Sequence, residues 1–232
     1  MSQGDQRRPV IAIDGPAGAG KSTVAKRVAD TLGYVLVDTG ALYRAVALAA
    51  ARAGISWDDE ARVGELAESL AARRAIALVP TPQGLRVDLD REDVSAAIRA
   101  PENSLGASRV SAIARVRAAL LSMQRGYLGD GGAVMEGRDI GTVVAPDAEV
   151  KMFVTASPEI RARRRYDELV AKGERPSLED TLRDVKKRDL ADETRAIAPL
   201  VPAADARVLD TSTMSIDDVV AAIVARARAI GG

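Results

Sequence analysis

Residues 15–22 form a pattern that can bind phosphate groups. They read Gly-Pro-Ala-Gly-Ala-Gly-Lys-Ser and match G-x-x-x-x-G-K-[ST]. The glycines let the backbone approach a ligand closely, so that successive N–H groups can point at phosphate oxygens. The lysine adds a positive charge for β and γ phosphates, the serine hydroxyl can ligate magnesium, and the next threonine can reach an α-phosphate. The residues expected to bind a nucleoside triphosphate are Gly15, Pro16, Ala17, Gly18, Ala19, Gly20, Lys21, Ser22 and Thr23.

The elements predicted around this loop are those that the motif requires. Residues 10–13 are an apolar run that predicts a buried strand, and residues 20–32 carry apolar side chains at helical spacing. A second strand at 34–37 and a helix at 41–53 follow. Because strands and helices alternate, the sequence predicts an α/β fold of the phosphate-loop NTPase type, a parallel sheet flanked by helices.

The composition removes many kinds of catalytic site. The chain has 232 residues with no cysteine and no histidine, which excludes Cys/His zinc sites, thiol nucleophiles, disulfides and the Ser-His-Asp triad. Basic and acidic residues number 33 each and aromatic residues make up 3%, so a nucleic-acid-binding surface is not expected. The chemistry must therefore depend on charged and hydroxyl side chains, backbone amides and a hard metal ion such as magnesium.

The sequence also narrows the class of nucleotide-binding protein. GTPases read guanine with an Asn-Lys-x-Asp motif, but the single asparagine here, Asn103, is followed by Ser-Leu. Motor ATPases usually end their metal-binding strand with consecutive acidic residues, whereas residues 134–139 read Val-Met-Glu-Gly-Arg-Asp. A small-molecule kinase is the class that remains.

The middle of the chain departs from the alternation of strands and helices. A helix at 58–74 is followed by two apolar strands within 75–89, joined by a turn at 81–84, and by a short helix at 93–99. This pattern predicts an antiparallel hairpin. We expect an inserted subdomain at about 66–107, and the alternative is a meandering loop.

After this insert the alternation resumes. The expected elements are a helix at 108–128, strands at 133–135 and 149–154, helices at 157–172 and 177–194, a strand at 207–209 and a C-terminal helix from 215. The core domain then comprises residues 9–65 and 108–232, and residues 1–8 are expected to be a disordered N-terminus.

Several arginines follow predicted strand ends, where ligands of open α/β sheets bind. Arg44 comes one helical turn after the second strand, and Arg138 follows the strand at 133–135. Arg115 and Arg117 lie on the helix that leads back from the insert. Guanidinium groups bind phosphate through two hydrogen bonds, so this clustering favours an anionic acceptor, although each arginine taken singly fits a surface position.

Six segments together resemble the bacterial cytidylate kinase family. In family order and spacing they are residues 15–22, Asp-Thr-Gly-Ala-Leu-Tyr-Arg at 38–44, Glu-Asp-Val-Ser at 92–95, Glu-Gly-Arg-Asp-Ile-Gly-Thr-Val-Val at 136–144, Lys-Arg-Asp at 187–189 and Ala-Pro-Leu-Val-Pro-Ala-Ala-Asp at 198–205. The resemblance implies transfer of the γ-phosphate of ATP, bound with Mg²⁺, to CMP or dCMP in pyrimidine nucleotide metabolism. It also implies the nucleoside monophosphate kinase fold, with an NMP-binding subdomain at 66–107 and a mobile helical lid at about 156–175.

The resemblance assigns roles to five residues near the phosphate and base of CMP. Arg44 and Arg138 match phosphate-binding arginines. Thr39 stands where the family usually has Ser or Thr near the pentose and base. Ser108 and Arg117 match residues that face the cytosine.

Three further residues complete the CMP site that the resemblance implies. Asp139 belongs to the acceptor site, next to the phosphate-binding arginine. Asp192 and Arg195 match residues that contact the sugar, with Asp192 placed for the 2′ and 3′ hydroxyls.

Residues 161–165 read Arg-Ala-Arg-Arg-Arg and are expected on a helix. Arg161, Arg164 and Arg165 share one face of it by i, i+3, i+4 spacing. Alone, this run could be a solvated face or a nucleic-acid patch, but the resemblance places it at the lid, whose arginines close over the phosphates. The expected catalytic residues are therefore Lys21, Arg161, Arg165 and Arg188.

Two other functions stay open from the sequence alone. One is a related kinase acting on another nucleotide or small metabolite, and the other is a nonenzymatic nucleotide-dependent switch or nucleic-acid-binding module. The N-terminus lacks the apolar run of a signal peptide, and no stretch of about 18 apolar residues occurs. We therefore expect a cytoplasmic monomer whose partners are ATP and CMP or dCMP, without nucleic acid or membrane.

Overall fold

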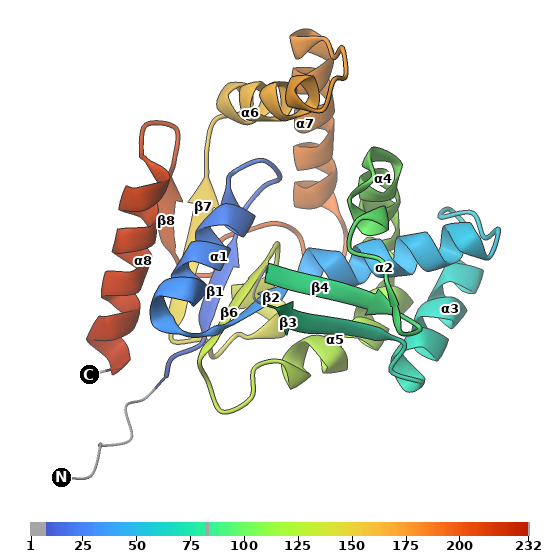
Figure 1. The fold of residues 1–232 in the computed structure, drawn as a ribbon, viewed down its shortest axis with the longest axis horizontal. Coiled ribbons are helices and arrows are strands. Elements are labelled where there is room, and N and C mark those ends of the chain that lie inside the picture. The colour runs from blue at the N-terminus through green and yellow to red at the C-terminus, as the bar shows by residue number, and fades with distance from the viewer. Residues whose placement is uncertain (1–7, 82–83, 232) are drawn as a thin grey trace. The chain divides into compact units, whose positions relative to one another are not determined.

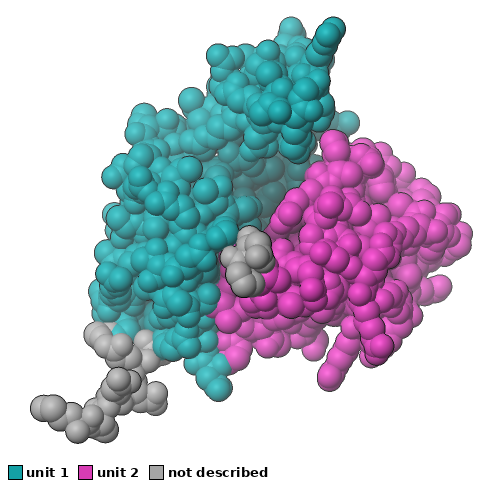
Figure 2. Space-filling model, in the orientation of Figure 1, with its two compact units in different colours: residues 1–34, 130–232 teal, residues 35–129 magenta. Residues whose placement is uncertain are grey.

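The computed structural model describes residues 8–81 and 84–231. The disorder expected at 1–8 concerns mainly residues 1–7, which lie outside the described residues, as do Pro82 and Gln83 of the predicted turn. Arg8 is described, and its guanidinium donates a hydrogen bond to the Gly33 carbonyl at 2.7 Å. The chain divides into two compact units, a first unit of residues up to 34 and from 130 onward, and a second unit of residues 35–129 (Figure 2).

The first unit contains parallel strands in the order β6-β1-β7-β8. Their bounds are β1 (Ile11–Asp14), β6 (Ala133–Gly137), β7 (Val150–Thr155) and β8 (Arg207–Asp210). Strands β1 and β6 are buried along their whole length, which explains why they read as continuous apolar runs. Asp14 pairs with Gly137 across the ladder, so the phosphate loop and the Arg138 segment leave the sheet from adjacent strand ends.

Four helices accompany these strands (Figure 1). Helix α1 (Lys21–Leu32) packs on β1 and β6, and α8 (Ile216–Gly231) packs on β7 and on α1. Helices α6 (Pro158–Ala171) and α7 (Leu178–Thr194) pack against each other. Serine side chains cap both helices: the hydroxyl of Ser157 accepts a hydrogen bond from the Ile160 amide at 3.2 Å, and that of Ser177 accepts one from the Asp180 amide at 3.3 Å.

The second unit combines helices with a small antiparallel sheet. Its elements are β2 (Val35–Asp38), α2 (Thr39–Arg52), α3 (Glu60–Ala72), β3 (Ile76–Thr81), β4 (Gly84–Leu89), β5 (Glu92–Asp93), the 3₁₀ turn η1 (Ala97–Arg99), α4 (Pro101–Val110) and α5 (Ala114–Gly126). Strands β3 and β4 are antiparallel, with Ile76 opposite Leu89, which confirms the predicted hairpin. Helix α2 packs on α3 and α4, and α5 packs on α3.

The single helix predicted at 108–128 is wrong, because the chain forms α4 and α5 with a break at residues 111–113. Ile113 is extended, with ψ of 120°. The Ser111 hydroxyl donates to the Ser108 carbonyl at 2.9 Å, and the Arg117 guanidinium donates to the Ser111 carbonyl at 3.2 Å. The two side chains thus hydrogen-bond to backbone carbonyls that have lost their helical partners at the end of α4, and this stabilises the break.

Two shorter elements also differ from the sequence expectation. The helix predicted at 93–99 is reduced to η1, because Glu92 and Asp93 pair with β4 as the strand β5. A π-helical turn, η2 (Ile140–Val144), follows β6 and was not predicted. Within the described ranges, the helices lack the combination of length and apolar character needed to span a membrane.

Candidate active site

The phosphate loop needs glycine for steric reasons at its first position. Gly15 has φ of 145°, and a Cβ atom there would lie 1.9 Å from the Val154 carbonyl oxygen. At Gly18, with φ of 76°, an added Cβ would lie 3.3 Å from the Cβ of Arg161. The first glycine therefore allows the loop to cross the end of β7, and the second lets it approach α6.

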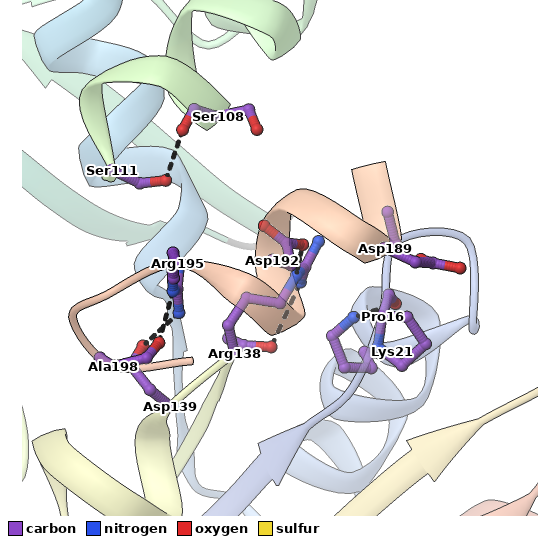
Figure 3. Close-up of polar contacts among 12 residues, drawn as sticks. Pro16, Lys21, Ser108, Ser111, Arg138, Asp139, Asp189, Asp192, Arg195 and Ala198 are labelled. Atoms are coloured by element: carbon purple, nitrogen blue, oxygen red, sulfur yellow. Dashed lines mark hydrogen bonds and ion pairs between the residues drawn. The ribbon is translucent and has the colours of Figure 1, made fainter. Parts of the chain in front are cut away.

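Lys21 is the first residue of α1 and is only 5% exposed. Its ammonium group donates to the Pro16 carbonyl at 2.7 Å, within the loop (Figure 3). Burial lowers the pKa of Lys21 to about 7, the charge of Arg138 acts in the same direction, and Glu136 and Asp14 oppose it. Ser22 and Thr23 are exposed on the first turn of α1, where their hydroxyls are accessible to a ligand. This arrangement fits an anion bound at a helix N-terminus.

Asp14 ends β1 and is 4% exposed, although it was not among the predicted site residues. One carboxylate oxygen accepts the Ile140 amide at 2.7 Å, and the other accepts the Gly141 amide at 2.8 Å. Burial raises the pKa of Asp14 to about 6, against the lowering effect of the two hydrogen bonds. The signal that could have identified it is an acidic residue directly between a buried strand and the glycine loop.

Four of the predicted CMP-binding residues gather in the first unit as two charge pairs (Figure 3). Arg138 donates from Nε to Asp192 at 2.9 Å. A terminal nitrogen of Arg195 lies 3.8 Å from Asp139, and the Arg195 Nε donates to the Ala198 carbonyl. Burial acts to raise the pKa of Asp192, but the charge and hydrogen bond of Arg138 outweigh it, so the pKa is lowered. Arg138 is thus oriented by a carboxylate, and Arg195 by the Ala198 carbonyl with the charge of Asp139 nearby.

Arg161, predicted to be catalytic, is buried and has hydrogen-bonded donors on all three guanidinium nitrogens. Its Nε donates to the Ala156 carbonyl at 2.8 Å. Its two terminal nitrogens donate to the two carboxylate oxygens of Asp189 on α7, at 2.8 and 2.6 Å. One of them also donates to the Ala17 carbonyl of the phosphate loop at 3.2 Å. The side chain therefore ties the loop, α6 and α7 together. Asp189 lies 28 residues from Arg161 and belongs to the Lys-Arg-Asp segment at 187–189, but the sequence assigned it no role in the site.

The other arginines of this region have different surroundings. Arg165 is more than a third exposed and lies 3.3 Å from Glu168 on the same helix. Arg164 donates to the hydroxyl and carbonyl of Thr211 at 3.2 and 2.9 Å. Arg188 lies on α7, and its charge acts to lower the pKa of both Lys21 and Asp192. The helix face predicted from spacing thus carries side chains with separate partners.

In the second unit, Asp38 connects the start of α2 to a predicted phosphate ligand. One of its oxygens caps the helix by accepting the Ala41 amide at 3.0 Å, and the other accepts the Arg44 guanidinium at 2.5 Å. A Cβ at Gly40 would lie 3.1 Å from the Asp38 carboxylate and 3.2 Å from an Arg44 nitrogen, so glycine leaves room for this pair. Thr39 is buried directly after the cap.

The two residues expected to face cytosine are linked within the second unit through Ser111, whose bond to Ser108 is drawn in Figure 3. Ser111 donates to the Ser108 carbonyl, and its own carbonyl accepts the Arg117 guanidinium. The same guanidinium lies over the Tyr43 ring, 5.7 Å from its centroid, and is buried. The break between α4 and α5 therefore brings this predicted pair together.

Comparisons with known proteins agree over almost the whole chain. The sequence profile of a family described as cytidylate kinase matches residues 11–229. A cytidylate kinase from Pelotomaculum thermopropionicum is 51% identical over 222 residues, which are 95% of this chain and 96% of the relative. Another from Solibacter usitatus is 47% identical, with 100% of this chain and 98% of the relative covered.

A solved structure shows the same type of fold at low sequence similarity. An uncharacterized protein from Eubacterium ventriosum superposes with a TM-score of 0.52 and 12% identity, covering 94% of this chain and 97% of its own. The sheet and phosphate loop described above agree with the predicted α/β fold. With a family match over residues 11–229 and 51% identity to a named relative, the chain belongs to the cytidylate kinase family and is a nucleoside monophosphate kinase.

Proposed function

We propose that the protein transfers the γ-phosphoryl group of ATP directly to CMP or dCMP, giving ADP and CDP or dCDP. The observation that carries the proposal is the buried Lys21 ammonium inside the glycine loop, 2.7 Å from the Pro16 carbonyl. Burial makes the charged form of Lys21 unfavourable when no anion is bound. A phosphate bound at this place would stabilise that charge. Family membership then supports CMP as the acceptor.

The reaction needs little covalent chemistry from the protein. A phosphate oxygen of the acceptor attacks the γ-phosphorus while the bond to the β-phosphate oxygen breaks, so the protein must align the two and stabilise their charge. We assign charge stabilisation to Lys21, Arg165 and Arg188. Because Arg161 already uses its donors on Asp189 and two carbonyls, we assign it to holding the loop rather than to binding phosphate.

Magnesium would fit beside Ser22. The hydroxyl is an oxygen donor exposed on the first turn of α1, next to Lys21. Among the described residues, no group of three or more His, Cys, Asp or Glu side chains could hold a metal ion. This suits Mg²⁺, which is usually held by substrate phosphates and water with one or two protein ligands. Bound there, the ion would neutralise the charge of the transferred group.

The residues proposed for the CMP phosphate are two arginines that each donate to a carboxylate. Arg44 and Arg138 would take this phosphate, and each is already oriented by a carboxylate, Asp38 or Asp192. Such pairing holds a guanidinium in one direction before the ligand arrives, which reduces the entropy lost on binding.

The base and sugar would be recognised by polar groups. Ser108 and Arg117 would face the cytosine, and Thr39 would lie near the pentose and base. The remaining residues proposed for the sugar and the acceptor site are Asp139, Asp192 and Arg195.

A coupled assay of ADP release tests this function. Wild-type protein is supplied with ATP, Mg²⁺ and one of CMP, dCMP, UMP, AMP or dTMP, and kcat/KM is compared. We expect CMP and dCMP to give the highest values, and turnover to stop with excess EDTA. A preference for UMP or AMP over CMP would contradict the proposal and favour a related kinase. A monomeric state, which light scattering can test, and a cytoplasmic location stay predictions from the sequence.

A further inference from the structure

Asp14 joins two segments that are far apart in the sequence. It is the last residue of β1, immediately before the phosphate loop, and its carboxylate accepts the amides of Ile140 and Gly141, 126 and 127 residues away. Each oxygen takes one amide, at 2.7 and 2.8 Å. Both carboxylate oxygens therefore bind the segment that follows β6.

These two amides begin the turn η2. Its N-cap residue, Asp139, makes no side-chain cap of its own. The first amides of a helical turn lack partners within it, and Asp14 supplies those partners from another strand. Position 141 is also enclosed, since a Cβ there would lie 3.2 Å from the Lys151 Cδ and 3.4 Å from Asp14. The start of η2 is thus fixed to the end of β1.

The residues directly before these amides are the proposed acceptor ligands Arg138 and Asp139. Their side chains pair with Asp192 and Arg195 at the end of α7 and just after it. We propose that Asp14 is a positioning residue for the acceptor: it holds Arg138 and Asp139 at a fixed distance from the phosphate loop. The proposal rests on the proposed function only in taking CMP as the acceptor.

A positioning role predicts an unequal effect on the two substrates. The amides held by Asp14 belong to the acceptor segment, whereas Lys21, Ser22 and the loop amides bind the triphosphate. Loss of the carboxylate should therefore shift Arg138 and Asp139 more than the ATP site. A displacement of about 1 Å can cost as much as 100-fold in rate, so a small movement would be measurable.

The test compares Asp14→Asn with Asp147→Asn. Asparagine at position 14 has the shape of aspartate, but its NH₂ group would face one of the two backbone N–H groups that the carboxylate binds, so one hydrogen bond is lost. The second variant makes the same change at an exposed aspartate. We expect Asp14→Asn to lower kcat/KM for CMP at least about 30-fold, since it misplaces the acceptor ligands. The Kd of a non-hydrolysable ATP analogue, measured by calorimetry, should rise less, by at most about tenfold, because Asp14 acts on that site through its charge near Lys21. Asp147→Asn should match the wild type in both.

Gly141→Ala keeps the proposal testable if Asp14→Asn does not fold. Its methyl group would press on the same contact from the acceptor side. We expect the same selective loss for CMP, of about fivefold, because the displacement is smaller. Equal losses for CMP and the ATP analogue, or no loss in either folded variant, would overturn the proposal.

The wild-type control separates this proposal from the proposed function. If wild-type protein does not phosphorylate CMP, the function is wrong. The two variants are then assayed with whichever monophosphate the wild type phosphorylates. The proposal still requires that kcat/KM for that acceptor falls more than the affinity for the ATP analogue.

Discussion

The phosphate loop and the helix pair α6–α7 both carry cations in the first unit, but these cations have different partners. Lys21 donates to a neutral carbonyl of its own loop. Arg161 is equally buried and donates to both oxygens of Asp189. A phosphate could therefore bind the Lys21 ammonium in place of a neutral carbonyl, whereas it would have to displace a carboxylate to bind Arg161.

This difference separates binding from positioning among basic residues that look alike in the sequence. Arg161 donates from all three guanidinium nitrogens to protein groups, so it fixes the surrounding chain, and removing Asp189 would leave an uncompensated charge. Arg44 and Arg138 each donate to a carboxylate through one nitrogen, which orients them toward a ligand.

A buried ammonium that donates to a neutral carbonyl, as Lys21 does, is a better candidate to bind an incoming anion. Arg165 is intermediate between Lys21 and Arg161. It is partly exposed, and its carboxylate partner, Glu168, lies 3.3 Å away on the same helix.

The largest effect is expected for Lys21→Ala. Loss of this charge removes stabilisation that is strongest in the transition state, so kcat should fall at least about 100-fold. Steady-state assays with saturating ATP and CMP measure it. Lys26→Ala, on the exposed side of the same helix, is the matched control and should retain wild-type turnover. Near-normal turnover of the Lys21 variant would refute its catalytic role.

The second-largest effect is a loss of folding stability when the Arg161–Asp189 pair is broken. Arg161→Ala and Asp189→Ala should each lower the free energy of unfolding by about 2–3 kcal/mol, because each leaves a buried charge without its partner. The double variant should lose less than the sum, since the two residues share one interaction. Urea denaturation followed by circular dichroism measures all three. Strict additivity would show that the pair is not coupled.

A smaller effect should appear in the pH dependence of nucleotide binding. Burial lowers the pKa of Lys21 from 10.5 to about 7, so above pH 7 the folded, ligand-free protein carries mostly neutral Lys21. Phosphate binding restores the proton, so affinity should fall as pH rises above 7, by at most about tenfold per unit. The same shift makes the Lys21 contribution to stability increase between pH 7 and 10.5.

Calorimetry at pH 8 in two buffers with different ionisation enthalpies measures this proton uptake. The binding heats of a non-hydrolysable ATP analogue should differ between the buffers for the wild type. Lys21→Met, which cannot take up the proton, should remove the difference. Equal heats for the wild type would contradict the assignment.

The smallest change in stability is expected for Arg165→Ala. An exposed pair with Glu168 should contribute less than about 0.5 kcal/mol, so unfolding by urea should hardly change. If Arg165 binds the transferred phosphate, kcat should nevertheless fall several-fold. A stability loss like that of Arg161→Ala would remove the distinction between the two arginines.

Local features of the site were predictable from the sequence, and contacts between distant segments were not. The glycine loop, the Ser157 and Ser177 caps and the β3–β4 hairpin each depend on residues close together in the chain. The break between α4 and α5 depends on the hydrogen bond from the Arg117 side chain to the Ser111 carbonyl, and helical periodicity does not predict such a bond.

The same reason explains the two carboxylates that sequence reasoning missed. Asp14 meets amides 126 and 127 residues away, and Asp189 meets an arginine on another helix. Neither position has a motif that signals its partner. The family resemblance assigned Arg161 to a lid that closes over the phosphates, and the structure gives its contacts with Ala17 and Asp189.

Transfer of the γ-phosphoryl group to CMP is the central claim, and the fate of a labelled γ-phosphate tests it most directly. Wild-type protein is incubated with γ-labelled ATP, Mg²⁺ and CMP, and the products are separated by chromatography. We predict that the label moves into the β-phosphate of CDP in a one-to-one ratio with ADP formed. Label found in inorganic phosphate, with CMP unchanged, would contradict the claim.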